Sequence, residues 1–164
     1  MRVTEIMTPD VVTVGPDTPI NEVARVMVEY DISGVPVVDD GGALVGIITE
    51  FDMIARQADY DAPISTVFFD ALIVMPEPHG EEKLRKILAT RAEELMTRTV
   101  YSIREDASIE EVASLMYERK VNPVPVVSFD GTVIGIVSRS DIVRLMVREV
   151  AAEDGLEGER EAQG

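Results

Sequence analysis

The sequence predicts an α+β fold in which two similar units pack around a pseudo-two-fold axis. The main observation is an internal repeat: when the 164-residue chain is shifted by 89 positions, residues 6–55 align with residues 95–144 without a gap. Eighteen of the fifty aligned positions are identical, and the apolar fraction of 46% supports a real core. Because a unit of about fifty residues buries too little surface to be stable alone, we expect the two units to form one globular body.

Each repeat is expected to begin with a strand and a helix. In the first repeat Val11–Val14 is the predicted strand, and Pro19 suits the first turn of a helix. The apolar residues of this helix recur at positions i, i+3, i+4 and i+7, the spacing of one helix face: Ile20, Val23, Ala24 and Met27. The second repeat carries the same stripe, and its Ser108 and Glu111 have the spacing of a capping box.

A strand–turn–strand segment and a closing helix complete each repeat. The predicted strands are Val35–Val38, Leu44–Ile48, Val124–Val127 and Val133–Val137, and the predicted closing helices are Glu50–Arg56 and Arg139–Val150. A glycine-containing loop between two apolar runs is typical of a hairpin. Pro36 and Pro125 cannot donate a ladder hydrogen bond, so we expect their strands to lie at a sheet edge or to start there.

These elements divide the chain into four parts. Residues 1–56 hold the first repeat, 57–91 an insertion, 92–150 the second repeat, and 151–164 an acidic tail that we expect to be disordered. The insertion contains an apolar segment, 68–75, followed by an amphipathic helix, 81–95, with Leu84, Ile87, Leu88 and Leu95 on one face. It is either a connector packed on the body or a surface for a dimer or partner.

Composition excludes several function classes. The formal charge of −16 disfavours binding to nucleic acid and to anionic membranes. The absence of cysteine removes disulfides, thiolate catalysis and zinc–sulfur sites, and no metal site is expected. No apolar run approaches a membrane span and the first residues lack a signal-peptide core, so we expect a cytoplasmic protein. No nucleophile–base motif occurs, so we expect no enzyme and no catalytic cofactor.

The strongest pattern that could carry chemistry occurs once in each repeat, where a strand meets the closing helix. Thr49 precedes Asp52 by three positions, and Ser138 precedes Asp141 in the same way. A hydroxyl at a helix start suits phosphate, and an aspartate one turn later can accept hydrogen bonds from a ribose diol. The same spacing is also that of a capping box, which needs no ligand. On spacing alone the cap is the favoured interpretation, and ligand binding stays open as the alternative.

Taken together, these motifs resemble a tandem pair of CBS domains, also called a Bateman module. The matching segments of the first repeat are Ile6-Met7-Thr8, Val35-Pro36-Val37-Val38-Asp39 and Gly46-Ile47-Ile48-Thr49-Glu50-Phe51-Asp52. Those of the second repeat are Leu95-Met96-Thr97, Val124-Pro125-Val126-Val127 and Gly135-Ile136-Val137-Ser138-Arg139-Ser140-Asp141. The resemblance covers residues 3–56 and 92–148. It implies β-α-β-β-α repeats joined through their sheets, and two clefts that often bind AMP, ADP or ATP and less often S-adenosylmethionine.

The resemblance also implies roles for individual residues. Asp52 and Asp141 would hold ribose hydroxyls, and Thr49 and Ser138 would contact phosphate. Further contacts would come from residues just before the strands and from backbone near the adenine: Ser33, Gly34, Asn122, Pro123, Val12 and Tyr101. Because base and ribose contacts can come from opposite repeats in this family, Ser33 and Val12 would group with Ser138 and Asp141. Asn122 and Tyr101 would group with Thr49 and Asp52.

The two sites are not expected to be equal. Arg139 follows Ser138 and could reach a phosphate, whereas its counterpart Glu50 would repel one. We therefore favour the Ser138/Asp141 site. The resemblance then implies a non-catalytic regulatory module that binds an adenosine nucleotide, forms a homodimer and signals in trans to an effector protein. The alternative is an assembly or interaction module without a ligand.

Overall fold

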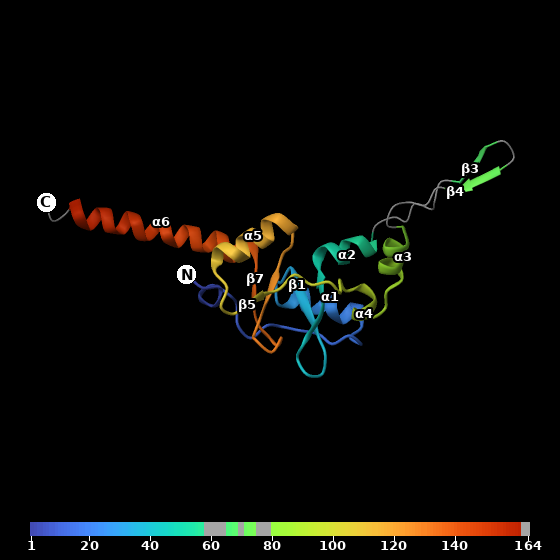
Figure 1. Ribbon diagram of the computed structural model, residues 1–164, viewed down its shortest axis with the longest axis horizontal. Coiled ribbons are helices and arrows are strands. Elements are labelled where there is room, and N and C mark those ends of the chain that lie inside the picture. The colour runs from blue at the N-terminus through green and yellow to red at the C-terminus, as the bar shows by residue number, and fades with distance from the viewer. Residues whose placement is uncertain (58–64, 69–70, 75–79, 162–164) are drawn as a thin grey trace. The chain divides into compact units, whose positions relative to one another are not determined.

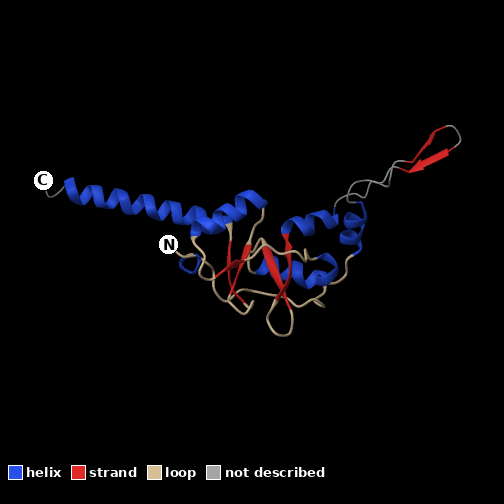
Figure 2. Cartoon of the chain, in the orientation of Figure 1, coloured by secondary structure: helices blue, strands red, loops and turns tan. Residues whose placement is uncertain are grey.

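The computed structural model describes residues 1–57, 65–68, 71–74 and 80–161 (Figure 1). The elements are η1 (Val3–Glu5), α1 (Ile20–Glu29), β1 (Gly34–Val38), β2 (Leu44–Thr49), α2 (Glu50–Gln57), β3 (Ser65–Phe68), β4 (Ala71–Val74), α3 (Gly80–Leu88), α4 (Ala92–Leu95), β5 (Ile103–Arg104), α5 (Ile109–Arg119), β6 (Val124–Val127), β7 (Val133–Val137) and α6 (Arg139–Glu161). Short strands and helices follow one another along the chain, which confirms the α+β class (Figure 2).

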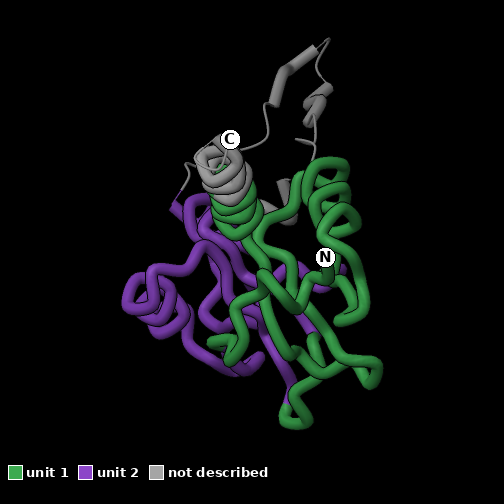
Figure 3. Tube along the Cα trace, turned by 90° about the vertical axis from the view of Figure 1, so that its left-hand side faces the viewer, with its two compact units in different colours: residues 1–12, 40–44, 100–164 green, residues 13–39, 45–99 purple. Residues whose placement is uncertain are grey.

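The chain forms two compact units, and each contains pieces of both repeats. Unit 1 consists of residues 1–12, 40–44 and 100–164, and unit 2 of residues 13–39 and 45–99 (Figure 3). Residues 1–12 lead into the first repeat but belong to the unit that holds most of the second. Residues 92–99, which lead into the second repeat, belong to the unit that holds most of the first.

Both leading segments attach in the same way. In unit 1, Thr8 exchanges two backbone hydrogen bonds with Ile136, at 2.9 and 3.0 Å. In unit 2, Thr97 exchanges two with Ile47, at 2.9 and 3.1 Å. These are the same alignment positions in the two repeats. Each pairing lies next to a glycine, Gly135 or Gly46, against which a methionine packs.

A methionine of each leading segment lies directly over a strand glycine. A methyl group added at Gly46 would come within 2.7 Å of Met96 Cγ, and one added at Gly135 within 2.9 Å of Met7 Cγ. Both distances are shorter than non-bonded carbon atoms allow, so only glycine leaves room for the methionine. Met96 is fully buried in the core of unit 2, and Met7 packs on the core of unit 1.

In unit 2, β1 and β2 form a two-stranded sheet. The predicted strand Val11–Val14 is wrong: only Val14 pairs, through a single parallel bridge to Val37. A turn follows at once, in which Gly15 N–H donates to Thr18 Oγ1 and Thr18 N–H donates to the Gly15 carbonyl. The pairing therefore cannot extend beyond Val14.

The sheet of unit 1 has three strands in the order β5-β6-β7. β6 is therefore central, although it contains Pro125. The proline is tolerated because it is the second residue of the strand, opposite Ile136, and pairing with β5 begins one residue later at Val126. Of the two placements predicted for this proline, near the strand start is the one observed.

The helices agree with the sequence patterns except in the insertion and at the end of the second repeat. Ser108 caps α5 as predicted, in a capping box with Glu111. The single helix expected over 81–95 is instead two helices, α3 and α4. Glu94 interrupts the helix because its carboxylate accepts hydrogen bonds from the backbone N–H groups of Thr90 and Arg91, which starts a new helix. Leu88 of the expected apolar face is exposed.

Two predicted regions lie partly outside the described residues. Of the apolar segment 68–75, the structure describes the backbone of β4 and Phe68, and β3 pairs with β4 antiparallel. The helix α6 runs to Glu161, beyond the predicted end at Val150, so the tail that we expected to be disordered is helical up to that residue. Alanine and glutamate, which favour helix, are frequent in the added segment. Residues 162–164 lie outside the described part.

Candidate functional site

The two hydroxyl–aspartate pairs lie at equivalent strand-to-helix junctions. Thr49 is the last residue of β2 and Asp52 lies in the first turn of α2, within unit 2. Ser138 follows β7 and Asp141 lies in the first turn of α6, within unit 1. The strand fixes the hydroxyl residue and the helix turn brings the carboxylate back over it, so both pairs are set by local geometry.

The bonding inside the two pairs is the same. In unit 2, the Thr49 backbone N–H and hydroxyl both donate to Asp52 Oδ2, each at 2.9 Å. In unit 1, the Ser138 backbone N–H and hydroxyl donate to Asp141 Oδ2 at 2.8 and 2.7 Å. In each repeat the aspartate Oδ2 accepts both of these short-range hydrogen bonds. The other oxygen, Oδ1, accepts a hydrogen bond from a lysine or arginine side chain.

Each junction forms only one of the two hydrogen bonds that define a capping box. The acid accepts from the backbone N–H at the start of the helix, as a capping box requires. The hydroxyl, however, donates its proton to the carboxylate instead of accepting from a helix amide. The side chains of Thr49 and Ser138 therefore orient the aspartates, and the cap interpretation accounts for only part of the geometry.

The partner of Oδ1 distinguishes the two junctions. Asp52 Oδ1 accepts from Lys86 Nζ at 2.6 Å, and the two side chains are only 5% and 13% exposed. Asp141 Oδ1 accepts from Arg144 Nη1 at 2.9 Å, and here Arg144 is 67% exposed while Asp141 is 11% exposed. An exposed pair contributes about 0–1 kcal/mol, whereas removing one partner of a buried pair costs about 3–5 kcal/mol. Arg144 can be displaced far more easily than Lys86.

The first residue of each closing helix is also held at equivalent positions. The Glu50 N–H donates to the Ser33 backbone carbonyl at 3.0 Å. The Arg139 N–H donates to the side-chain Oδ1 of Asn122 at 2.8 Å. Ser33 and Asn122, both expected at the site, therefore fix the start of α2 and of α6. Only the Asn122 contact can be removed by a side-chain substitution.

The remaining expected residues divide between the units. Val12, Tyr101, Asn122 and Arg139 belong to unit 1 with Ser138 and Asp141, and Gly34 belongs to unit 2 with Ser33, Thr49 and Asp52. Tyr101 is partly exposed, and the Arg119 guanidinium lies 5.3 Å from the centre of its ring. Arg139 is exposed at the start of α6. The expected groupings that combine Ser33 with Ser138, or Asn122 with Thr49, join residues of different units and stay predictions.

The sequence analysis missed two cations at the junctions, Lys86 and Arg144. Arg144 follows Asp141 by three positions, so helix spacing could have indicated it, whereas Lys86 has no such signal. Lys86 lies in α3, 34 positions after Asp52, inside the insertion. The apolar spacing of this segment predicts a buried face with Leu84 and Leu88, yet both are exposed while the side chain of Lys86 is nearly buried. Lys86 is one of three basic residues in a charged helix, and nothing in the local sequence singles it out for such a role. Arg56, which donates to the Ala89 carbonyl, adds a second link between α2 and the segment after α3.

Comparison with known proteins identifies the family. The CBS domain profile matches residues 3–59 and 92–148, which are more than half of the chain. The chain belongs to the CBS domain family. The two matches coincide with the two internal repeats, so the protein carries a tandem CBS pair. Among the helices in the part of the chain that the structure describes, none has the length and apolar character needed to cross a bilayer.

Relatives of this CBS pair include an enzyme and proteins solved with adenosine compounds. The chain is 33% identical over 150 residues to inosine-5'-monophosphate dehydrogenase of Methanocaldococcus jannaschii, covering 92% of this chain but only 24% of that protein. The structure of CBSX2 in complex with AMP, from Arabidopsis thaliana, has a TM-score of 0.69 at 28% identity, covering 90% of this chain and 96% of that one. The CBS pair of protein MJ0100 in complex with 5'-methylthioadenosine and S-adenosyl-L-methionine has the same TM-score and identity, covering 91% and 98%.

Proposed function

We propose that this CBS pair is a non-catalytic regulatory module that binds an adenosine nucleotide at the Ser138–Asp141 junction. AMP, ADP and ATP are the expected ligands, ahead of S-adenosylmethionine. The observation that carries the proposal is the contrast between the two aspartates: Asp141 Oδ1 faces an exposed arginine, and Asp52 Oδ1 is held in a buried ion pair. Support also comes from the similar CBS structures solved with AMP and with S-adenosyl-L-methionine.

Each residue of the junction has a defined task in this proposal. Asp141 is oriented by Ser138 and would accept a ribose hydroxyl on Oδ1 once Arg144 moves aside. Arg139 would pair with the phosphate near the start of α6, where the helix dipole also favours an anion. Val12, Tyr101 and Asn122 are the candidates for further contacts in the same unit. Binding would then change the contacts offered to an effector protein, which is how the signal would pass in trans.

Asp52 is not expected to bind ribose in the resting protein. A ligand would have to displace Lys86 from a nearly buried carboxylate, and Glu50 beside it would repel a phosphate. The Thr49–Asp52 junction is therefore proposed to be structural. This gives a stoichiometry of one nucleotide per chain.

Isothermal titration of the ligand-stripped protein tests the proposal. We expect one of AMP, ADP or ATP to bind with a stoichiometry of one per chain, and GMP not to bind. Asp141→Ala should weaken binding by about 10- to 100-fold, because hydrogen bonds to a charged group contribute about 1.5–3 kcal/mol. The matched control is Asp52→Asn combined with Lys86→Met, which removes the buried pair as a whole and should leave the affinity within about threefold. Equal losses in both variants would contradict the assignment.

The alternative function is assembly without a ligand. The observation in its favour is that both hydroxyl–aspartate pairs are satisfied internally, by Thr49 and Lys86 in one repeat and by Ser138 and Arg144 in the other. The net charge of −16 also disfavours phosphate ligands. If no adenosine compound binds or shifts the melting temperature at millimolar concentration, this alternative becomes the better account.

A further inference from the structure

The helix α3 is attached to α2 mainly through polar contacts. Lys86 Nζ in α3 donates to Asp52 Oδ1 in α2 at 2.6 Å, and both side chains are nearly buried. The Arg56 guanidinium of α2 donates to the Ala89 carbonyl, one residue after α3 ends. Because Asp52 and Arg56 are four positions apart, they lie on the same face of α2. The two contacts therefore attach α3 to one face of α2, at the Thr49–Asp52 junction.

The apolar side chains of α3 contribute little to this attachment. Of the side chains that the structure describes in α3, Leu84 to Leu88, none belongs to the buried core of unit 2 or packs on it. Leu84 is 38% exposed and Leu88 is 66% exposed. Helices in globular proteins are usually held in place by burying an apolar face. In α3 the leucines instead face solvent and Lys86 faces inward, so polar contacts supply most of the attachment.

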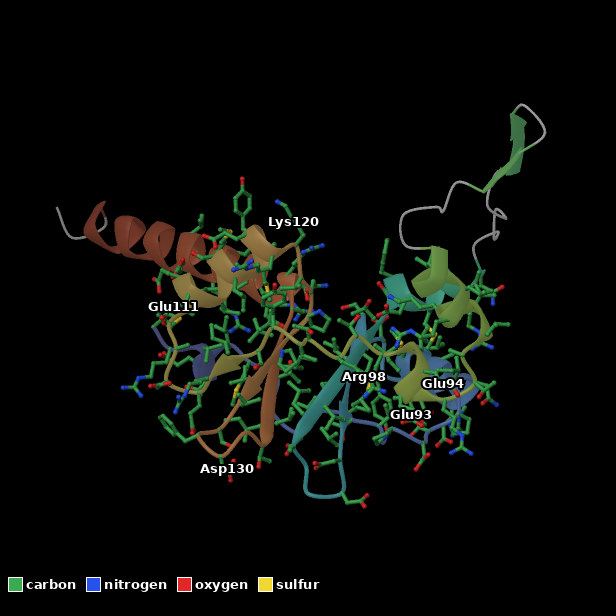
Figure 4. All side chains as sticks on the ribbon, turned by 45° about the vertical axis from the view of Figure 1, so that its right-hand side comes forward. Glu93, Glu94, Arg98, Glu111, Lys120 and Asp130 are labelled. Atoms are coloured by element: carbon green, nitrogen blue, oxygen red, sulfur yellow. The ribbon has the colours of Figure 1, made fainter. Side chains whose placement is uncertain are left out.

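The chain that follows α3 is anchored independently. The next helix, α4, carries Glu93 and Glu94 (Figure 4), and its Ala92 and Leu95 are fully buried in the core of unit 2. On this side of α3 the core begins at Ala89, directly after the helix ends. Elements with few buried apolar contacts open locally at a lower free energy than the core. We therefore expect α3 to detach from α2 while α4 stays in place.

The second repeat is built differently at this point. Its closing helix α6 continues to Glu161, whereas α2 ends at Gln57 and the insertion brings α3 back onto Asp52. The equivalent aspartate, Asp141, is contacted by Arg144 of its own helix from an exposed position. The helix α3 is therefore an addition to the first repeat that restricts access to its aspartate.

We propose that α3 is a detachable lid that keeps a second ligand site closed at the Thr49–Asp52 junction. In the closed state Lys86 occupies Asp52 Oδ1, which corresponds to the ribose acceptor proposed for Asp141. Lys86 and a ribose diol compete for this one oxygen, so the site binds its ligand only when α3 is detached. The inference rests on the proposed function for the role of the oxygen, whereas the lid itself can be tested without a ligand.

The open site favours an uncharged nucleoside over a nucleotide. Glu50 is exposed at the start of α2, two positions before Asp52, and withdrawal of Lys86 removes a cation that offsets these two charges. Both carboxylates repel a phosphate, whereas adenosine brings only a neutral base and the diol. Binding is weakened by the fraction of molecules that are open, so a lid open in about 1% of molecules raises the apparent dissociation constant about 100-fold. The two junctions thus respond to different ligands.

Hydrogen exchange followed by mass spectrometry tests the lid in the ligand-free protein. In the wild-type chain we expect the amides of α3 to exchange at least about tenfold faster than those of α1, because α3 opens without the core. Lys86→Met should speed the exchange of α3 by about tenfold or more, since it removes one partner of a nearly buried ion pair. Arg144→Met is the matched control and should leave the exchange of α3 unchanged.

Titration with adenosine tests the second site. The measurements are made in the Asp141→Ala background, which weakens the first site. Adding Lys86→Met should give binding of one adenosine per chain, about 100-fold tighter than with Lys86 present, and ATP should bind about tenfold more weakly than adenosine. Adding Asp52→Asn as well should weaken adenosine binding by about tenfold or more, because the charged acceptor is gone. Lys86→Gln is a milder second variant and should give the same order of affinities.

Each result has a defined meaning. Equal exchange rates of α3 and α1 in the wild-type chain, or exchange of α3 that Lys86→Met does not change, would overturn the lid. Fast exchange of α3 in both Lys86 variants without adenosine binding would overturn the second site. If Asp141→Ala alone left nucleotide affinity unchanged while α3 opened as expected, the proposed function of the first site would be wrong and the lid would stand.

Discussion

Replacing Lys86 by methionine should destabilise unit 2 strongly. The substitution keeps most of the side-chain volume and removes the ammonium group that lies 2.6 Å from Asp52 Oδ1. Because both side chains are nearly buried, the remaining carboxylate would lose a partner that water only partly replaces. Fully buried pairs cost about 3–5 kcal/mol when one member is removed, and since Thr49 still donates two hydrogen bonds to Asp52, we expect about 2–3 kcal/mol here.

The assay is reversible urea or thermal unfolding followed by circular dichroism. A loss of this size lowers the melting temperature by about 4–12 °C in a chain of this length, using about 2–4 °C per kcal/mol. Arg144→Met is the matched control, since Arg144 contacts the equivalent aspartate from an exposed position and should cost less than about 1 kcal/mol. The double variant Asp52→Asn with Lys86→Met should recover most of the stability. If Lys86→Met cost no more than Arg144→Met, the reasoning from burial would be refuted.

Two further predictions concern the glycines under the methionines and the start of α4. Gly46→Ala and Gly135→Ala should each lower the free energy of unfolding, measured in urea, by about 1–3 kcal/mol, because the new methyl group overlaps Met96 or Met7. Gly15→Ala is the control and should not lower it, because the nearest atom to the new methyl group is 3.8 Å away. Hydrogen bonds from Thr90 hold the pKa of Glu94 below its usual range. The ionised carboxylate therefore stabilises the fold at any pH above the pKa of a glutamate in the unfolded chain. This contribution is lost as the pH falls through the lower pKa of the folded state. Glu94→Gln should therefore flatten the acid side of the stability–pH profile.

The glycine variants and Glu94→Gln could each contradict the reasoning behind them. Equal stability of the Gly15 and Gly46 variants would show that the leading segment can move away from the strand without cost. An unchanged acid profile in Glu94→Gln would show that the hydrogen bonds from Thr90 do not persist in solution. Both measurements use the same unfolding assay as Lys86→Met.

Local sequence patterns predicted the elements whose contacts are themselves local. The capping box of Ser108 with Glu111 and the Ser138–Asp141 pair both span three positions, so the spacing predicts that each hydroxyl lies beside its acid. It does not fix the direction of the hydrogen bond, since the Ser108 hydroxyl accepts from the Glu111 N–H and the Ser138 hydroxyl donates to the Asp141 carboxylate. The four hairpin strands were also predicted, because apolar runs on both sides of a glycine turn leave few other arrangements. Patterns of this kind need no knowledge of the rest of the chain.

The parts that the sequence did not predict depend on contacts between distant positions. Nothing near Lys86 indicates that it pairs with Asp52, since the two are 34 positions apart and α3 carries a more obvious apolar stripe. The strand expected at Val11–Val14 had the right residue types but pairs only at Val14, directly before the turn at Gly15. The segment 81–95 forms two helices because the Glu94 carboxylate accepts a hydrogen bond from the Thr90 N–H, which would otherwise continue the first helix.

The exchange of leading segments has a consequence for how such a chain could arise and how it can be divided. Residues 1–12 complete the unit that holds most of the second repeat, and residues 92–99 complete the unit that holds most of the first. If the chain arose by duplication of one repeat, two copies of that repeat could have completed each other by exchanging this arm. An excised repeat would still lack its borrowed arm. However, a separate peptide that carries Met7 and Thr8 could bind to a chain that begins at Val11 and complete the fold of unit 1.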